Sequence, residues 1–156
     1  YEGTNGIQAN DLRGRKVLKD QGAAMRSYIA EILQTAETLK SNSEFKKIAE
    51  MLEEAATNLE TTTNFVIENS KLGQNFVGGV AFNFLMMMGY VSGSWYMARS
   101  AERALVFAHD GDSEFINRKL ASVRFYFAQL LPRYKGYMDA IINGADIGFS
   151  MHESNF

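Results

Sequence analysis

The residues best suited to chemistry stand at the start of the chain. Glu2 is a lone carboxylate that precedes the run Gly3-Thr4-Asn5-Gly6, and a helical pattern follows directly. Gly3 and Gly6 permit backbone conformations closed to other residues and let a bulky ligand approach the main chain. Thr4 and Asn5 are residue types that cap helices, and the free N–H groups at a helix start favour phosphate. The same residues also suit an ordinary junction between a loop and a helix, so both interpretations stay open.

Other residues with catalytic or metal-binding potential lack a suitable pattern. His109 and His152 are far apart in the sequence and have no acidic residue at metal-ligand spacing, and no Glu-x-x-His pair occurs. The acidic cluster at Glu50, Glu53 and Glu54 has the spacing of a solvated helix face. No nucleophile elbow, P-loop or dinucleotide fingerprint is present. We therefore expect no metal site and no second catalytic motif.

Apolar residues recur at steps of three and four over most of the chain, and the chain has a single proline, Pro132. This spacing is typical of amphipathic helices, which proline would interrupt. We predict an all-α fold, an antiparallel up-down four-helix bundle preceded by a short N-terminal helix. The expected elements are a short helix over residues 7–19, a helix over 23–40, a helix that follows a capping box at 41–44 and closes near 71–73, a charge-free helix over 72–98, and a helix over 112–143 with a kink at Pro132.

The segment from Leu72 to Ala98 contains no charged residue. Its length suffices to span a bilayer, and Gly89 and Gly93 have the spacing of small residues in membrane helix pairs. Against this, the segment carries several Asn, Gln and Ser side chains, and the flanking amphipathic helices need an apolar partner. We therefore expect a core helix with close crossings at its glycines and no membrane insertion. Its Met86-Met87-Met88 run is interpreted as filling gaps in the core.

The overall composition narrows the class of protein. The net charge is −2 and basic residues are dispersed among carboxylates, so nucleic acid is not an expected partner. The absence of cysteine excludes disulfides and thiolate metal sites and agrees with a reducing compartment, and we expect a cytoplasmic location. Residues 1–20 are polar and do not have the pattern of a signal peptide. Because the chain opens within a motif and without an initiator Met, we expect it to be the C-terminal piece of a longer protein.

The opening motif carries a resemblance to a known family. Tyr1-Glu2-Gly3-Thr4, two variable residues and Ile7-Gln8 resemble the segment that holds the catalytic carboxylate in flavin-dependent acyl-CoA dehydrogenases. The variable pair is Asn5-Gly6, where many members have Ser followed by a polar or acidic residue. The continuation from Ala9 to Lys16 is similar to the long-form subgroup, which has an additional C-terminal helical domain and includes 3-methylmercaptopropionyl-CoA dehydrogenase-like enzymes. The Leu130-Leu131-Pro132 run and the apolar helix before it also match that domain. The resemblance implies a catalytic-loop segment and short helix over residues 1–20 and a helical-bundle domain over 21–156.

The resemblance also implies a reaction and the residues that serve it. Glu2 would be the base that removes the α-proton of an acyl-CoA thioester, and its backbone N–H would stabilise the enolate oxygen. Gly3 would lie against the substrate, and Thr4, Asn5 and Gly6 would lie against the flavin. FAD, an acyl-CoA, an electron acceptor and a homo-oligomeric assembly would belong to the intact parent enzyme. The flavin-binding elements would lie upstream of Tyr1, so we expect no FAD on this fragment and no activity from it alone.

A second class of function competes with the first. The chain could instead be a non-catalytic helical module for interaction or assembly, with the first eight residues serving only as a cap. The coding sequence upstream of Tyr1 separates the two hypotheses, because a dehydrogenase requires several hundred further residues there, whereas a free-standing module requires a start codon or a linker.

Overall fold

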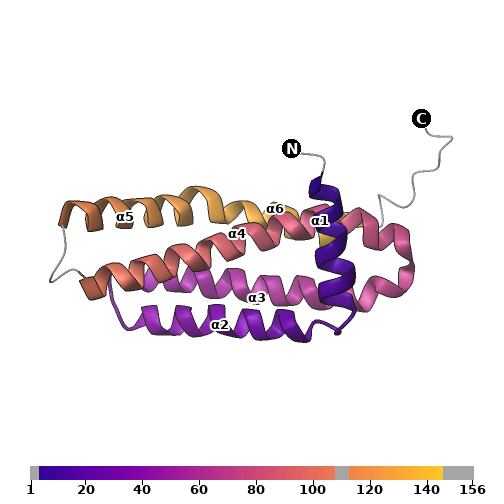
Figure 1. The fold of residues 1–156 in the computed structure, drawn as a ribbon, viewed down its shortest axis with the longest axis horizontal. Coiled ribbons are helices and arrows are strands. Elements are labelled where there is room, and N and C mark those ends of the chain that lie inside the picture. The colour runs from indigo at the N-terminus through magenta and orange to yellow at the C-terminus, as the bar shows by residue number, and fades with distance from the viewer. Residues whose placement is uncertain (1–3, 108–112, 146–156) are drawn as a thin grey trace.

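The computed structural model describes residues 4–107 and 113–145, and these residues contain helices and no β-strand (Figure 1), which confirms the predicted all-α class. The long helices lie side by side with successive directions reversed, and the first helix lies crosswise to them (Figure 1). In chain order, the elements are α1 (Asn5–Asp11), the π-helical segment η2 (Leu12–Leu18), α2 (Ala23–Lys40), α3 (Lys46–Asn69), the short 3-10 turn η3 (Ser70–Leu72), α4 (Gln74–Phe107), α5 (Ser113–Phe125), the π-helical segment η4 (Tyr126–Leu130), the 3-10 turn η5 (Leu131–Arg133) and α6 (Tyr134–Ile142).

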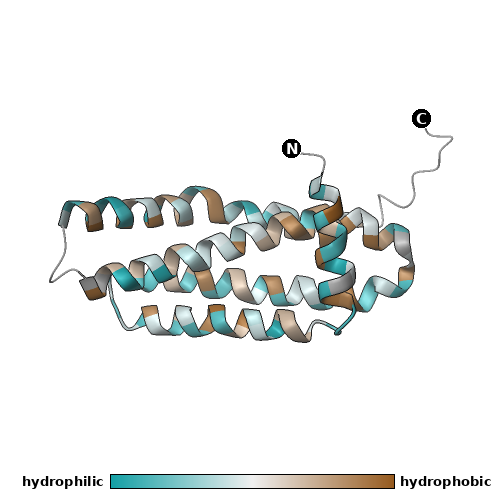
Figure 2. Cartoon of the chain, in the orientation of Figure 1, coloured by the Kyte–Doolittle hydropathy of each residue, from teal (hydrophilic) through white to brown (hydrophobic). Residues whose placement is uncertain are grey.

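Helices α2 and α3 form an antiparallel pair whose apolar faces were predictable from their spacing. In Figure 2 both helices alternate hydrophobic and hydrophilic residues along their length. The side chains of α2 that the three-four spacing selects are all buried, and α2 has the predicted bounds. Burying such a stripe removes apolar surface from water, which is the main stabilising contribution to a bundle. The buried side chains of α2 are Met25, Ile29, Ile32, Ala36 and Leu39.

The predicted capping box between α2 and α3 is wrong. The Ser41 hydroxyl donates to the carbonyl oxygen of Thr38 at 2.8 Å, so it serves the end of α2. The Asn42 side-chain oxygen accepts from the backbone N–H of Glu44 at 2.9 Å, which forms a turn before α3. Buried Phe45 occupies the N-cap position of α3 and makes no side-chain cap hydrogen bond. Burial of the Phe45 ring, rather than a polar cap, therefore determines where α3 begins.

Helix α4 contacts α1, α2, α3, α5 and α6, so the charge-free segment does form the centre of the fold. It continues past Ala98 to Phe107, and along this extension Ala101 and Ala104 are buried while Arg99 and Arg103 are exposed. The helix is not covered on all sides: Phe84 is fully buried, whereas Phe82 is 48% exposed. Met87 is buried and Met86 and Met88 are half-buried, in agreement with a core-filling role.

The length and composition of Asn75–Ala104 would also allow this stretch to cross a membrane, and 39% of its most apolar window is buried. Core helices of soluble proteins meet the same criterion, so this finding is weak support for a membrane span. The expected absence of membrane insertion stays a prediction.

Of Gly78, Gly89 and Gly93 on α4, only Gly93 makes a close approach. A Cβ atom on Gly93 would lie 2.0 Å from the Tyr126 hydroxyl oxygen, so the absence of a side chain there lets α4 accept this ring. The Tyr126 hydroxyl donates to the carbonyl oxygen of Tyr90 at 3.1 Å. A Cβ atom on Gly78 or Gly89 would meet nothing within 4 Å, so the predicted crossing does not occur at those positions.

The last helix is interrupted around Pro132, as predicted, and the interruption shifts its register. Pro132 has no N–H to donate and lies within the 3-10 turn η5, which follows π-helical η4 in place of regular α-helix. The wider turn places Leu131 in the core and leaves Leu130 only half-buried. The three-four spacing instead predicts Leu130 on the buried face. The register recovers at Tyr134, whose buried hydroxyl accepts a hydrogen bond from the Asn58 amide at 2.8 Å.

Candidate functional site

The residues predicted to contact a flavin lie at the free end of the crosswise helix. Thr4 occupies the N-cap position of α1, but its side chain makes no cap hydrogen bond. Thr4, Asn5 and Gly6 are exposed, and a Cβ atom on Gly6 would meet nothing within 4 Å. The backbone at Gly6 is therefore open to a large group. Glu2 and Gly3, the predicted base and substrate contact, lie outside the described residues.

The helix behind this loop is anchored to the bundle through one face. Ala9 and Val17 are buried, and α1 packs against α4 while η2 contacts α2, α3 and α4. Ala9, Arg13 and Val17 are four residues apart, so they share this face. The anchored face holds the helix against the bundle and leaves its N-terminal end projecting beyond the long helices (Figure 1).

Arg13 is the residue of this region that sequence reasoning missed. Its Nε and Nη1 atoms are buried and have no hydrogen-bond acceptor among the described residues. The same burial lowers the pKa of the Arg13 guanidinium below its ordinary value. Buried donors without acceptors cost about 1–3 kcal/mol each, so an acceptor at this position would stabilise the helix. Arg13 is four residues from Ala9 and four residues from Val17, and this spacing was the signal in the sequence that could have indicated its burial.

A tight turn joins the crosswise helix to α2 and sets the angle between them. One Asp20 carboxylate oxygen accepts from the Gly22 N–H at 3.0 Å, and the other accepts from the Ala24 N–H at 2.9 Å. Gln21 and Gly22 have φ angles of 54° and 78°, both in the left-handed region. The Gly22 N–H also lies 2.8 Å from the carbonyl oxygen of Val17, which ties the turn to the end of η2. The chain therefore turns from the crosswise helix into α2 within three residues.

We expect Gly22→Ala to destabilise the fold by about 1–2 kcal/mol, since alanine is strained at a positive φ angle. A Cβ atom there would also lie 2.7 Å from Ile67 Cδ1 on α3. Gly14→Ala is the matched control: a Cβ atom meets nothing within 4 Å in this helical position, so stability should rise by about 0.4–1 kcal/mol. Urea denaturation followed by circular dichroism measures both. Equal stabilities of the two variants would show that the turn does not require glycine.

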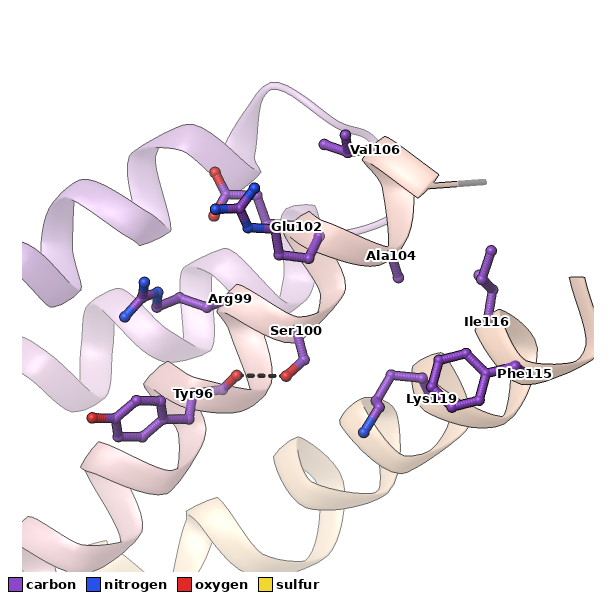
Figure 3. Close-up of a pocket in the computed structure, with 10 residues that line it drawn as sticks. Tyr96, Arg99, Ser100, Glu102, Ala104, Val106, Phe115, Ile116 and Lys119 are labelled. Atoms are coloured by element: carbon purple, nitrogen blue, oxygen red, sulfur yellow. Dashed lines mark hydrogen bonds between the residues drawn. The ribbon is translucent and has the colours of Figure 1, made fainter. Parts of the chain in front are cut away.

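A cavity at the far end of the bundle does not coincide with the predicted site. It has a volume of about 760 Å³ and lies between the end of α4 and the start of α5 (Figure 3). That end of the bundle is opposite to the one that α1 crosses (Figure 1). Thr4, Asn5 and Gly6 do not line it. The described part of the predicted site, Thr4 to Gly6, is therefore an exposed edge that lines neither this cavity nor three smaller ones elsewhere on the bundle.

The described residues hold no group of three or more His, Asp or Glu side chains that could bind a metal ion. Since His109 and His152 lie outside the described residues, the expected absence of a metal site stays a prediction.

Comparison with known proteins identifies relatives over most of the chain. Residues 23–152 match the family described as acetyl-CoA dehydrogenase C-terminal like. The chain is 34% identical over 133 residues to 3-methylmercaptopropionyl-CoA dehydrogenase of Ruegeria pomeroyi, covering 84% of this chain and 23% of the relative. It is 26% identical to the broad-specificity linear acyl-CoA dehydrogenase FadE5 of Mycobacterium tuberculosis, covering 85% of this chain and 23% of the relative. A butyryl-CoA dehydrogenase of Syntrophomonas wolfei is 26% identical and matches all of this chain and 26% of its own length. The chain thus spans about a quarter of the length of these relatives.

Proposed function

Because this chain belongs to the acetyl-CoA dehydrogenase C-terminal-like family, we propose that it is the C-terminal region of a FAD-dependent acyl-CoA dehydrogenase. The observation that carries the proposal is the presence of two features in one chain. The Tyr1-Glu2-Gly3-Thr4 motif precedes a segment, residues 23–152, that matches the family. We assign residues 1–20 to the catalytic-loop segment and its helix, and residues 21–156 to the additional helical bundle.

In this proposal Glu2 is the base of the reaction. The α-proton of a thioester is weakly acidic, so its removal needs a positioned carboxylate and stabilisation of the enolate oxygen. Displacement of water by the acyl chain would disfavour the charged carboxylate of Glu2 and make it a stronger base. The Glu2 backbone N–H would donate to the thioester oxygen, and Gly3 would leave room for the substrate.

The open backbone at Gly6 fits the approach of a flavin, and Thr4, Asn5 and Gly6 would contact it. A bound flavin supplies the acceptor for the hydride that leaves the β-carbon. These three residues form one exposed edge, so the remaining walls of the site would come from the rest of the dehydrogenase. In the intact enzyme we also propose a homo-oligomer, a separate electron acceptor and a cytoplasmic location.

The bundle would contribute by holding the helix behind the catalytic loop. Ala9 and Val17 fix this helix to the bundle, and the turn at Asp20–Gly22 fixes the angle at which it leaves α2. A catalytic base must lie within hydrogen-bond reach of the proton that it removes. Rigid attachment of the helix that follows the catalytic loop would therefore help to position Glu2.

We predict that the purified 156-residue chain is colourless and does not oxidise acyl-CoA. Three exposed residues at the start of α1 cannot enclose a dinucleotide, so FAD added to the chain should be removed by gel filtration. The visible absorbance of the protein peak measures flavin retention. A yellow peak with stoichiometric flavin would mean that the bundle holds a complete site. The reaction itself is tested in a full-length dehydrogenase that carries this chain, by mixing it with an acyl-CoA and following the flavin absorbance.

A further inference from the structure

The cavity between α4 and α5 is a groove with apolar walls and a basic rim. We refer to it as the basic-rimmed groove and define it by six of the residues that line it. These are Tyr96, Arg99, Arg103 and Val106 of α4 and Phe115 and Lys119 of α5. Along α4 these residues extend over ten positions, which corresponds to about 15 Å of helix. The groove is thus long enough to receive two to three turns of a second helix.

The walls of the groove expose large apolar side chains to solvent. Tyr96 is 60% exposed, Val106 is 62% exposed and Phe115 is 56% exposed. Single exposed apolar residues are ordinary, but three that share one groove form a patch of the kind that marks interaction sites. The patch also lies apart from the buried face of α4, so it does not contribute to the core of this chain.

The rim carries an excess of positive charge. Arg99, Arg103 and Lys119 line the groove together with one described carboxylate, Glu102. Within the described part of the chain, none of these three cations forms an ion pair. Elsewhere cations do pair between helices, as in Lys40 with Glu53 at 2.8 Å, in a chain whose net charge is −2. Among the described residues that line it, the groove therefore carries more basic than acidic side chains.

The cations are spread along the groove and do not converge on one point. Arg99 extends away from α5 in Figure 3, and its guanidinium lies 5.2 Å from the centre of the Trp95 ring. Lys119 lies on the other wall, with its Nζ atom 6.0 Å from the centre of the Phe115 ring (Figure 3). A small anion would need several donors aimed at one position. Separated cations on both walls instead suit a partner that carries carboxylates at several positions.

We propose that the basic-rimmed groove binds an acidic, amphipathic helical segment of another protein. The apolar face of that helix would cover Tyr96, Val106 and Phe115, and its carboxylates would pair with Arg103 and Lys119 at the rim. Apolar contacts at i, i+3 and i+4 positions are the usual means by which a helix binds in a groove. The rim charges would contribute orientation and a salt-dependent association rate. This inference is independent of the catalytic role proposed for Glu2.

Selection from a displayed library of random 18-residue peptides against the 156-residue chain tests the proposal. The enriched peptides should be acidic and amphipathic, and their affinity should fall as salt is raised. Fluorescence anisotropy with one enriched, labelled peptide then measures the variants. Arg103→Glu/Lys119→Glu should weaken binding by about tenfold or more, because attractive charges become repulsive. Tyr96→Ser should also weaken it by about tenfold or more, since buried tyrosines contribute strongly to interfaces.

The matched control is Lys16→Glu/Lys46→Glu, which changes the net charge equally at exposed sites that do not line the groove and should leave the affinity within about twofold of wild type. Circular dichroism establishes that every variant is folded. The proposal is overturned if no peptide is enriched, if the enriched peptides are neutral or basic, or if the groove and control variants bind equally. A dimer seen by light scattering that Arg103→Glu/Lys119→Glu abolishes would assign the groove to a second copy. Binding to phosphatidylglycerol vesicles that the same variant abolishes would assign it to a membrane surface, and either result would also overturn the proposal.

Discussion

In a full-length dehydrogenase that carries this chain, Glu2→Gln is expected to lose the bleaching of the flavin by acyl-CoA. The amide is nearly isosteric with the carboxylate but cannot accept the α-proton. General-base catalysis contributes about 10²–10⁴-fold to a rate, so the rate of flavin reduction should fall by a factor in that range. Flavin content and thermal stability should stay at the wild-type values, because the residue precedes the first helix and is not expected to be part of the core. Anaerobic stopped-flow absorbance measures the rate.

Thr4→Val is the companion variant, since Thr4 is exposed at the start of α1 and its side chain makes no cap hydrogen bond. If Thr4 contacts the flavin, the variant should retain less FAD at equilibrium while the reduction of the flavin that remains stays fast. The two variants thus separate the base from the flavin contact. Flavin reduction by Glu2→Gln at a rate close to wild type would place the base elsewhere.

The second large effect concerns the core, where Phe84→Ala should destabilise the fold by about 3–5 kcal/mol. Phe84 is fully buried on α4, and its truncation removes buried apolar surface and leaves a cavity. Phe82→Ala is a matched control on the same helix, because its ring is 48% exposed and should contribute less than about 1 kcal/mol. Urea denaturation of the isolated chain in aqueous buffer measures both variants.

The difference between these two phenylalanines also tests whether α4 is a core helix of a bundle in water or a membrane span. In a bundle in water, one face of α4 carries the stability and the other is dispensable. In a membrane span, the rings would differ little and the chain would need detergent to remain in solution. Similar losses of stability in the two variants would therefore contradict the described packing of α4.

The helices of this fold were predictable where one rule governs the sequence. In α2 the three-four spacing from Met25 to Leu39 reproduces both the bounds and the buried face, since a surface helix needs an apolar stripe. The predicted break at Pro132 also holds, because a residue without an N–H cannot continue the hydrogen-bond pattern. Local rules suffice at these places.

Predictions failed where packing overrides a local rule. Because of the π-helical turn before Pro132, Leu131 is buried in the core in place of Leu130. The spacing of apolar residues in the sequence does not indicate this wider turn. The start of α3 follows the burial of Phe45 in place of a polar cap. Gly89 has the spacing of a crossing glycine but faces open space, since only contacts between helices determine which glycine is approached.

In the candidate site and the groove, too, some residues could be predicted from the sequence and others could not. The motif at Thr4–Gly6 was recognisable because its residues are consecutive, and the structure shows the described part of it exposed on an anchored helix. The basic-rimmed groove was not recognisable, because Arg103 and Lys119 stand on separate helices and become neighbours only in the folded bundle. Arg13 was missed because a single arginine in a polar helix is ordinarily exposed.

Anaerobic titration of the full-length dehydrogenase with butyryl-CoA tests the central claim most directly. The purified enzyme should contain bound FAD, its visible absorbance should be bleached as butyryl-CoA is added, and mass spectrometry should detect the corresponding enoyl-CoA. If short acyl-CoA thioesters are poor substrates, longer and sulfur-containing ones extend the same titration. A full-length protein that binds no FAD, or whose bound FAD stays oxidised with every acyl-CoA, would contradict the assignment of this chain to a working acyl-CoA dehydrogenase.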